Sequence, residues 1–107
     1  MGLDIVLELE MSEFFEADDF QTDFFPILKA PAGWRGSRAE GWEAIYQLVG
    51  RRTGVDCCGE GTLEGNEAIL EFLSTLSRGQ WMVAASLEAL VATAPKYMTF
   101  RLNVWWF

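Results

Sequence analysis

Residues 97–107 read YMTFRLNVWWF and form the strongest strand pattern in the chain. Side chains alternate between the two faces of a strand, so this stretch divides into a core face and an outer face. The expected core face consists of Met98, Phe100, Leu102, Val104 and Trp106. The expected outer face consists of Tyr97, Thr99, Arg101, Asn103, Trp105 and Phe107. Aromatic residues occur on both faces, so we predict that either both faces are covered or one is an exposed apolar patch.

A second strand pattern occupies residues 3–11, LDIVLELEM. Its apolar face consists of Ile5, Leu7, Leu9 and Met11, and its other face of Asp4, Val6, Glu8 and Glu10. The pattern predicts a half-buried strand whose outer face is lined with carboxylates. Opposite charges on neighbouring strands stabilise a sheet, so we expect Arg101 of the C-terminal strand to pair with these carboxylates.

Two helices are predicted over about residues 38–49 and 64–78, where apolar residues recur at helical spacing. Ser37 and Glu40 stand at the start of the first helix in the S-x-x-E order of a capping box. A glycine follows each helix, as is typical of a helix end. Both helices are expected to pack an apolar stripe on the sheet.

Residues 80–84, QWMVA, predict a short buried strand, and residues 86–94 predict a further helix that Pro95 ends. A strand, a helix and another strand in this order form a crossover unit, whose two strands are expected to be parallel. We therefore expect a single domain over residues 1–107, of the α+β class. Its small mixed sheet would have three strands (the first, a short middle one and the C-terminal one), packed by three to four helices.

Two stretches, residues 29–36 and 50–65, are expected to be loops because glycine and proline are frequent in them. The second stretch has five glycines, but their spacing matches no phosphate-binding loop. Cys57 and Cys58 are adjacent, and a disulfide between neighbours is strained. The chain has no His, and a zinc site needs about four ligands. We therefore expect no metal and no cofactor.

The net charge of −8 is concentrated at one end of the chain. Residues 1–28 contain eight acids and no Lys or Arg, whereas residues 29–107 contain eight acids and eight bases. A strongly negative segment repels nucleic acids and anionic membranes and attracts basic surfaces. We therefore expect a partner protein with a basic surface, and no direct contact with nucleic acid or membrane. No signal-peptide pattern and no apolar run of about 18 residues is found, which favours a cytoplasmic location.

The most acidic stretch, residues 12–28, is also rich in phenylalanine. Its sequence, SEFFEADDFQTDFFPIL, contains five Phe and five acids. Ser12 is a candidate cap for a short helix, but no helical face collects all the Phe side chains. We expect some of these rings to be buried under the sheet and the others to be exposed or covered by a partner.

Catalysis is not expected from this sequence. The chain lacks His, the commonest general base, so its Cys and Ser residues lack the usual activating partner. Asp18, Asp19 and Asp23 are close in sequence, but the stretch lacks the glycine and closing Glu of a calcium loop. We therefore predict a binding protein and not an enzyme; an ordered metal among these three acids would revive the enzyme interpretation.

The leading hypothesis is an acidic inhibitor that covers a basic, nucleic-acid-handling surface of a partner protein. An immunity protein, an antitoxin, a phage anti-defence protein or a mimic of the DNA phosphates would each act in this way. The predicted partner-binding residues are Glu8, Glu10, Glu13, Phe14, Phe15, Glu16, Asp18, Asp19, Phe20, Asp23, Trp34 and Trp105. The alternative is a structural or accessory subunit that forms a homodimer through the aromatic outer face of the C-terminal strand.

Overall fold

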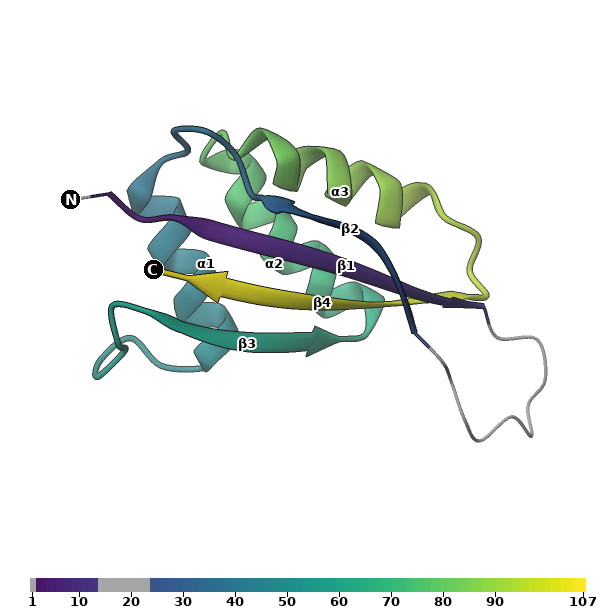
Figure 1. The fold of residues 1–107 in the computed structure, drawn as a ribbon, viewed down its shortest axis with the longest axis horizontal. Helices are drawn as coiled ribbons and strands as arrows, with labels where there is room; N and C mark the ends of the chain where they lie inside the picture. The colour runs from purple at the N-terminus through teal and green to yellow at the C-terminus, as the bar shows by residue number, and fades with distance from the viewer. Residues whose placement is uncertain (1, 14–23) are drawn as a thin grey trace.

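The computed structural model describes residues 2–13 and 24–107 and has the expected α+β fold (Figure 1). Within these residues, four antiparallel strands form one sheet in the order β2-β1-β4-β3, and three helices lie against one of its faces. The elements are β1 (Ile5–Glu13), β2 (Phe25–Pro31), α1 (Arg38–Val49), β3 (Gly59–Glu64), α2 (Asn66–Arg78), α3 (Met82–Thr93) and β4 (Met98–Trp106). No helix in the described part of the chain is long and apolar enough to cross a membrane.

The two strands that the alternation predicts, β1 and β4, pair with each other at the centre of the sheet. Their antiparallel register places Leu7 opposite Val104 and Leu9 opposite Leu102. All four side chains are fully buried beneath the helices. The core-facing sets of both strands are confirmed, with Met11 and Met98 only partly buried at one end of the sheet.

Helix α2 has more buried residues than α1 or α3. Its buried stripe consists of Ile69, Phe72, Leu73 and Leu76, as the helical spacing predicts. Asn66, at the first turn, also fastens α2 to β4 through two hydrogen bonds. Its amide nitrogen donates to the Met98 carbonyl at 3.1 Å, and its amide oxygen accepts from the Phe100 N–H at 3.1 Å. The helix start is therefore fixed relative to the central strand.

The sequence prediction missed both edge strands. Residues 50–65 were expected to form a loop, but Gly59–Glu64 pair with β4 as strand β3. The glycines of β3 lie on its helix-facing side, where larger side chains do not fit. A Cβ at Gly59 would lie 2.6 Å from the Trp106 ring, and one at Gly61 would lie 3.0 Å from the Leu48 side chain. These glycines reflect close packing and not turns.

The other edge strand, β2, includes part of the predicted loop at residues 29–36 and part of the acidic segment at residues 12–28. It pairs with β1, with an irregular register between Leu9 and Glu10. Pro26 and Pro31 lie within it, and proline is tolerated at the edge of a sheet because one side of an edge strand needs no partner. The prolines therefore marked an edge strand and not the absence of a strand.

The predicted short strand at residues 80–84 is wrong, and with it the parallel crossover. Met82–Thr93 form the single helix α3, and every strand pair in the described residues is antiparallel. A short apolar run does not distinguish a buried strand from a buried helix. Trp81, just before α3, is buried, and its indole N–H donates to the Ser37 carbonyl at 2.9 Å.

The start of α1 differs from the predicted capping box. The Ser37 hydroxyl donates to the Glu40 carboxylate and does not cap a backbone N–H of the first turn. This hydrogen bond is the main cause that lowers the pKa of Glu40. The Ser37 N–H donates to the Gly79 carbonyl at 2.6 Å, so the start of α1 is joined to the end of α2. The predicted ends at Gly50 and Gly79 are confirmed.

Packing around Trp81 yields a stability prediction. A Cβ at Gly36 would overlap the Trp81 ring, whereas a Cβ at Gly2 would meet nothing within 4 Å. We expect Gly36→Ala to lower the free energy of unfolding by about 1–3 kcal/mol because the indole must shift. Thermal unfolding followed by circular dichroism should then show a melting temperature lower by several degrees. Gly2→Ala is the matched control, and equal melting temperatures for the two variants would contradict this packing.

Candidate functional site

The candidate site is the open face of the sheet, on the side away from the helices (Figure 1). The strand register sets its side chains in rows across the sheet. Glu8 of β1, Asn103 of β4 and Thr62 of β3 form one row. Glu10 and Arg101 form part of the next row. Alternation along each strand therefore places a polar surface directly behind the apolar core.

Hydrogen bonds join this surface across three strands. The Asn103 amide nitrogen donates to Glu8 Oε1 at 3.0 Å and to Glu10 Oε1 at 2.7 Å. The Asn103 amide oxygen accepts from the Thr62 hydroxyl at 2.8 Å. Asn103 thus connects two carboxylates of β1 to a hydroxyl of β3. We call these four side chains, with Arg101, the polar ladder.

The predicted pairing of Arg101 with the carboxylates of β1 is confirmed. Arg101 Nε lies 2.7 Å from Glu10 Oε1, and the two side chains are 32% and 12% exposed. This hydrogen bond is the main cause that lowers the pKa of Glu10, and it raises the pKa of Arg101. The Arg101 guanidinium also lies 4.4 Å from the centre of the Phe24 ring. The negative charge of Glu10 is therefore paired with the positive charge of Arg101 within the fold.

Trp105 lies on the same face, one row away from the polar ladder. Its indole N–H donates to Glu60 Oε2 at 2.9 Å, and the Lys29 ammonium lies 4.5 Å from the centre of its ring. The side chain is half-buried, while Glu60 is exposed. Trp105 therefore orients the carboxylate of Glu60 on the edge strand, in addition to any contact with a partner.

The structure brings together three of the predicted partner-binding residues: Glu8, Glu10 and Trp105 all lie on the open face. Trp34 is apart from them. It is 82% exposed and borders a hollow at the start of β1, with Leu3 and Arg38. The remaining predictions concern side chains outside the described residues: Glu13, Phe14, Phe15, Glu16, Asp18, Asp19, Phe20 and Asp23.

The sequence prediction missed the contribution of β3 to this site. Glu60, Thr62 and Glu64 are exposed and alternate with inward-facing residues, so β3 adds two carboxylates to the open face. The period-two pattern of GEGTLE was the available signal, but its glycines favoured a loop. Lys29 of β2 was missed for the same reason, since its stretch was also expected to be a loop.

Carboxylates outnumber cations on the open face. The acids are Glu8, Glu10, Glu60 and Glu64, and the cations are Lys29 and Arg101. Asn103 and Trp105 hold Glu8 and Glu60 with neutral N–H groups, which orient a carboxylate but leave its charge in place. Within residues 2–13 and 24–107, no group of three or more Cys, Asp and Glu side chains is arranged to hold a metal ion. The arrangement suits recognition of a cationic surface.

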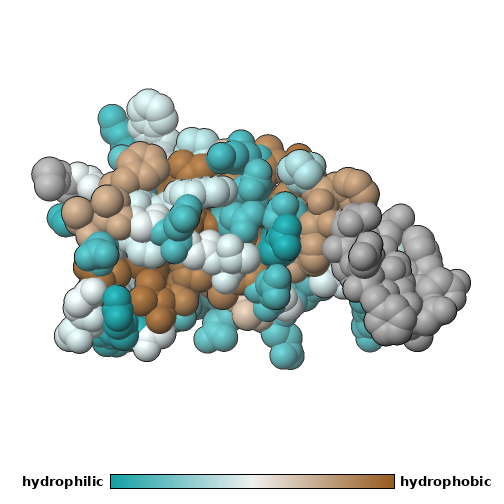
Figure 2. All heavy atoms as spheres, turned by 60° about the horizontal axis from the view of Figure 1, so that its bottom comes forward, coloured by the Kyte–Doolittle hydropathy of each residue, from teal (hydrophilic) through white to brown (hydrophobic). Residues whose placement is uncertain are grey.

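Apolar surface is also present near the site. A hollow of about 400 Å³ lies beside Trp105, Trp106 and Phe107 at one corner of the open face. Figure 2 brings the β3 side of the molecule forward and shows hydrophilic side chains interspersed among hydrophobic ones.

No family model, curated protein or solved structure matches this chain. Similarity to known proteins therefore gives no indication of what this protein does.

The ion pair predicts how stability depends on pH. Because the folded state lowers the pKa of Glu10 below its ordinary value of 4.5, Glu10 stabilises the fold above that pH. This contribution is lost as the pH falls through the folded pKa. We expect Glu10→Gln to cost about 1–2 kcal/mol at neutral pH and to equal wild type in strong acid. Urea unfolding at several pH values measures this, and Asp56→Asn in an exposed loop is the control. A pH-independent difference would contradict the role given to the ion pair.

Proposed function

We propose that this protein is an acidic inhibitor that binds a partner protein and covers a basic surface on it. The observation that carries the proposal is the excess of oriented carboxylates over cations on the described part of the open sheet face. Glu8 and Glu60 accept hydrogen bonds from the neutral donors Asn103 and Trp105. Neither carboxylate forms an ion pair within the described residues, although Lys29 lies opposite Glu8 in the strand register, so both would be available to Lys or Arg side chains of a partner.

Orientation matters because ordering a side chain on binding costs free energy. A long carboxylate side chain that is already held in place loses less rotamer freedom when it meets a cation. The rigid sheet beneath supplies the same benefit for the backbone, since β4 is hydrogen-bonded on both sides. Complementary charge would mainly speed association and select against acidic or neutral partners.

The acidic segment lies next to this face in the chain. Its residues 14–23 join β1 to β2, which pair antiparallel, so Glu13 and Phe24 lie at the same end of the sheet. The Phe24 ring lies 4.4 Å from the Arg101 guanidinium of the open face. Residues 14–23 carry four acids and no base. The segment and the open face together would present negative charge to one partner.

The charge pattern supports a class of target. Strongly basic protein surfaces commonly bind nucleic acids, whose phosphates they neutralise. An acidic protein that occupies such a surface would block a nuclease, a toxin or a defence complex. The immunity, antitoxin and anti-defence classes all fit this description, and closely spaced carboxylates would imitate phosphates.

Self-association is the second candidate, and one observation favours it. The apolar hollow beside Trp105, Trp106 and Phe107 would be covered if two open faces met at this corner. The polar ladder argues against a larger contact, because it would bring Glu8 and Glu10 of two copies close together. A homodimer of this kind would depend little on salt, whereas the inhibitor complex would weaken as salt screens its charges.

The first test is capture of a partner by the wild-type protein at low and high salt, with identification of what is retained. We expect a basic, nucleic-acid-handling protein that is released by about 0.5 M salt, where screening is strong. We also expect charge reversal at Glu13, Glu16, Asp18 and Asp19 to abolish retention with an unchanged melting temperature. Recovery of copies of the chain alone would favour self-association.

A second pair of variants tests the open face without disturbing its hydrogen bonds. Glu8→Gln with Glu60→Gln keeps acceptor oxygens in place and removes two charges, so we expect about tenfold weaker binding to the captured partner. Asp56→Asn with Glu88→Gln changes the net charge equally elsewhere and should leave affinity unchanged. If both double variants lose affinity equally, only the net charge matters. If both bind as tightly as wild type, the open face is not part of the interface.

A further inference from the structure

The two edges of the sheet are protected to different degrees. Edge strands expose main-chain N–H and C=O groups that can pair with another strand, and Pro, Lys and bulges block such pairing. Strand β2 has Pro26, Lys29 and Pro31, and its register with β1 is irregular. Strand β3 has no proline, lysine or register irregularity, its charged side chains are Glu60 and Glu64, and β4 is its only strand partner in the described residues. Figure 1 shows β3 as the outermost strand on its side.

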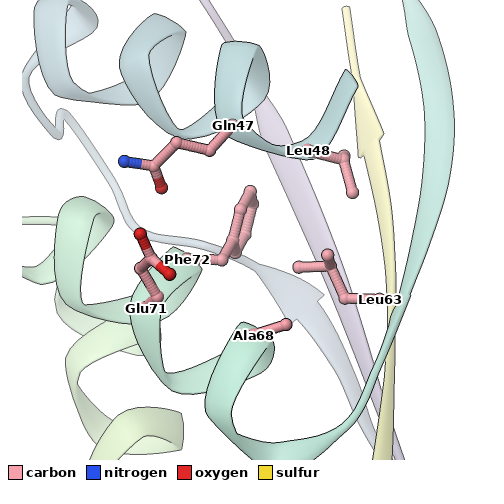
Figure 3. A pocket seen from close by; sticks show the side chains of 6 residues that line it. All are labelled: Gln47, Leu48, Leu63, Ala68, Glu71 and Phe72. Carbon is pink, nitrogen blue, oxygen red and sulfur yellow. The ribbon is translucent and has the colours of Figure 1, made fainter. Parts of the chain in front are cut away.

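A hollow lies on the helix side of this unprotected edge. It has a volume of about 240 Å³ and is lined by Gln47, Leu48, Leu63, Ala68, Glu71 and Phe72. In Figure 3, apolar side chains from α1, α2 and β3 point into it, and Gln47 and Glu71 lie at its opposite side. Leu63 is the inward-facing residue of β3 that borders the hollow. A strand added beside β3 would lie about 4.8 Å farther out, so its inward side chains would reach this hollow.

The outward face of β3 specifies charge. Glu60, Thr62 and Glu64 are exposed and lie on the open-face side of the strand. Residues directly opposite on an added strand would contact them, and opposite charges stabilise such cross-strand pairs. A second copy paired about Thr62 would place Glu60 opposite Glu64 twice, and like charges in that position destabilise pairing. In this register the two carboxylates disfavour a second copy and favour a basic strand.

We infer that β3 accepts an extended segment of the partner by strand addition. The segment would carry two Lys or Arg residues four positions apart, facing Glu60 and Glu64, with an apolar side chain between them entering the hollow. Main-chain hydrogen bonds would supply affinity, and the hollow and the carboxylates would supply specificity. The basic character of the segment rests on the proposed function, whereas the open edge and the hollow are independent of it.

A synthetic peptide tests this mode of binding with the purified full chain. The peptide acetyl-TKLTLKT-amide alternates two Lys and a Thr on one face with two Leu on the other. In nuclear magnetic resonance titrations of isotope-labelled protein, we expect saturable shifts of the backbone amides of residues 59–64. Replacing both Leu of the peptide by Ser should weaken binding about tenfold or more. Replacing both Lys by Glu should abolish it.

Protein variants locate the anchor. Ala68 is exposed and lines the hollow, so Ala68→Leu should fill the hollow and weaken peptide binding about tenfold. Ala89→Leu adds the same bulk on the exposed surface of α3 and is the matched control. Shifts centred on β2, or equal affinities for the two variants, would overturn strand addition at β3. Self-association through residues 59–64 without peptide would overturn it as well.

The outcomes separate this inference from the proposed function. A basic partner that binds wild type and Ala68→Leu equally, with no peptide binding at β3, would sustain the inhibitor and remove strand addition. Peptide binding at residues 59–64 without any salt-sensitive partner would sustain strand addition and remove the inhibitor. Binding that survives the Leu-to-Ser change in the peptide would show that charge alone holds it, which overturns the apolar anchor.

Discussion

The pairing of β1 with β4 is the constraint on which the rest of the structure depends. One register sets Leu7 and Leu9 against Val104 and Leu102 under the helices, and the same register sets Glu8 and Glu10 beside Asn103 and Arg101 on the open face. A slip of one residue would turn the leucines to solvent and the glutamates into the core. The core fixes the register because this register buries the most apolar area. The polar ladder favours the same register because its charged and hydrogen-bonded side chains are then neighbours. The candidate site is therefore the reverse side of the hydrophobic core.

Strong periodicity decided which elements the sequence could predict. The alternation extends over residues 5–10 of β1 and over most of β4, and α2 carries an apolar stripe of several turns, so local pattern and tertiary environment agree. The edge strands failed because Gly59 and Gly61 resemble turn residues, although they are small in order to pack against Trp106 and Leu48. Only the three-dimensional neighbours distinguish those two reasons for a glycine.

The candidate site shows the same division. The carboxylates of β1 and their pairing with Arg101 followed from alternation and opposite charge. The roles of Asn103 and Thr62 did not, because each bridges strands that are far apart in sequence and needs the register to be known. Asn103 was expected only to lie on the outer face, and its significance is that one amide group donates to two carboxylates and accepts from a hydroxyl. Asn103 is uncharged, so counting charges in the sequence does not reveal that it orients the carboxylates.

The placement of negative charge gives the molecule two properties at once. Carboxylates on the open face and on β3 repel a second copy, which matters because a sheet with a free edge otherwise tends to pair with itself. In the proposed function the same carboxylates would favour a cationic partner, since the donors that hold Glu8 and Glu60 are neutral. Arg101 forms its ion pair with Glu10, whose side chain is 12% exposed, and its positive charge also acts on Glu64 and Glu8. Ion pairing thus joins the two central strands of the open face, while the carboxylates of Glu8 and Glu60 are held by neutral donors.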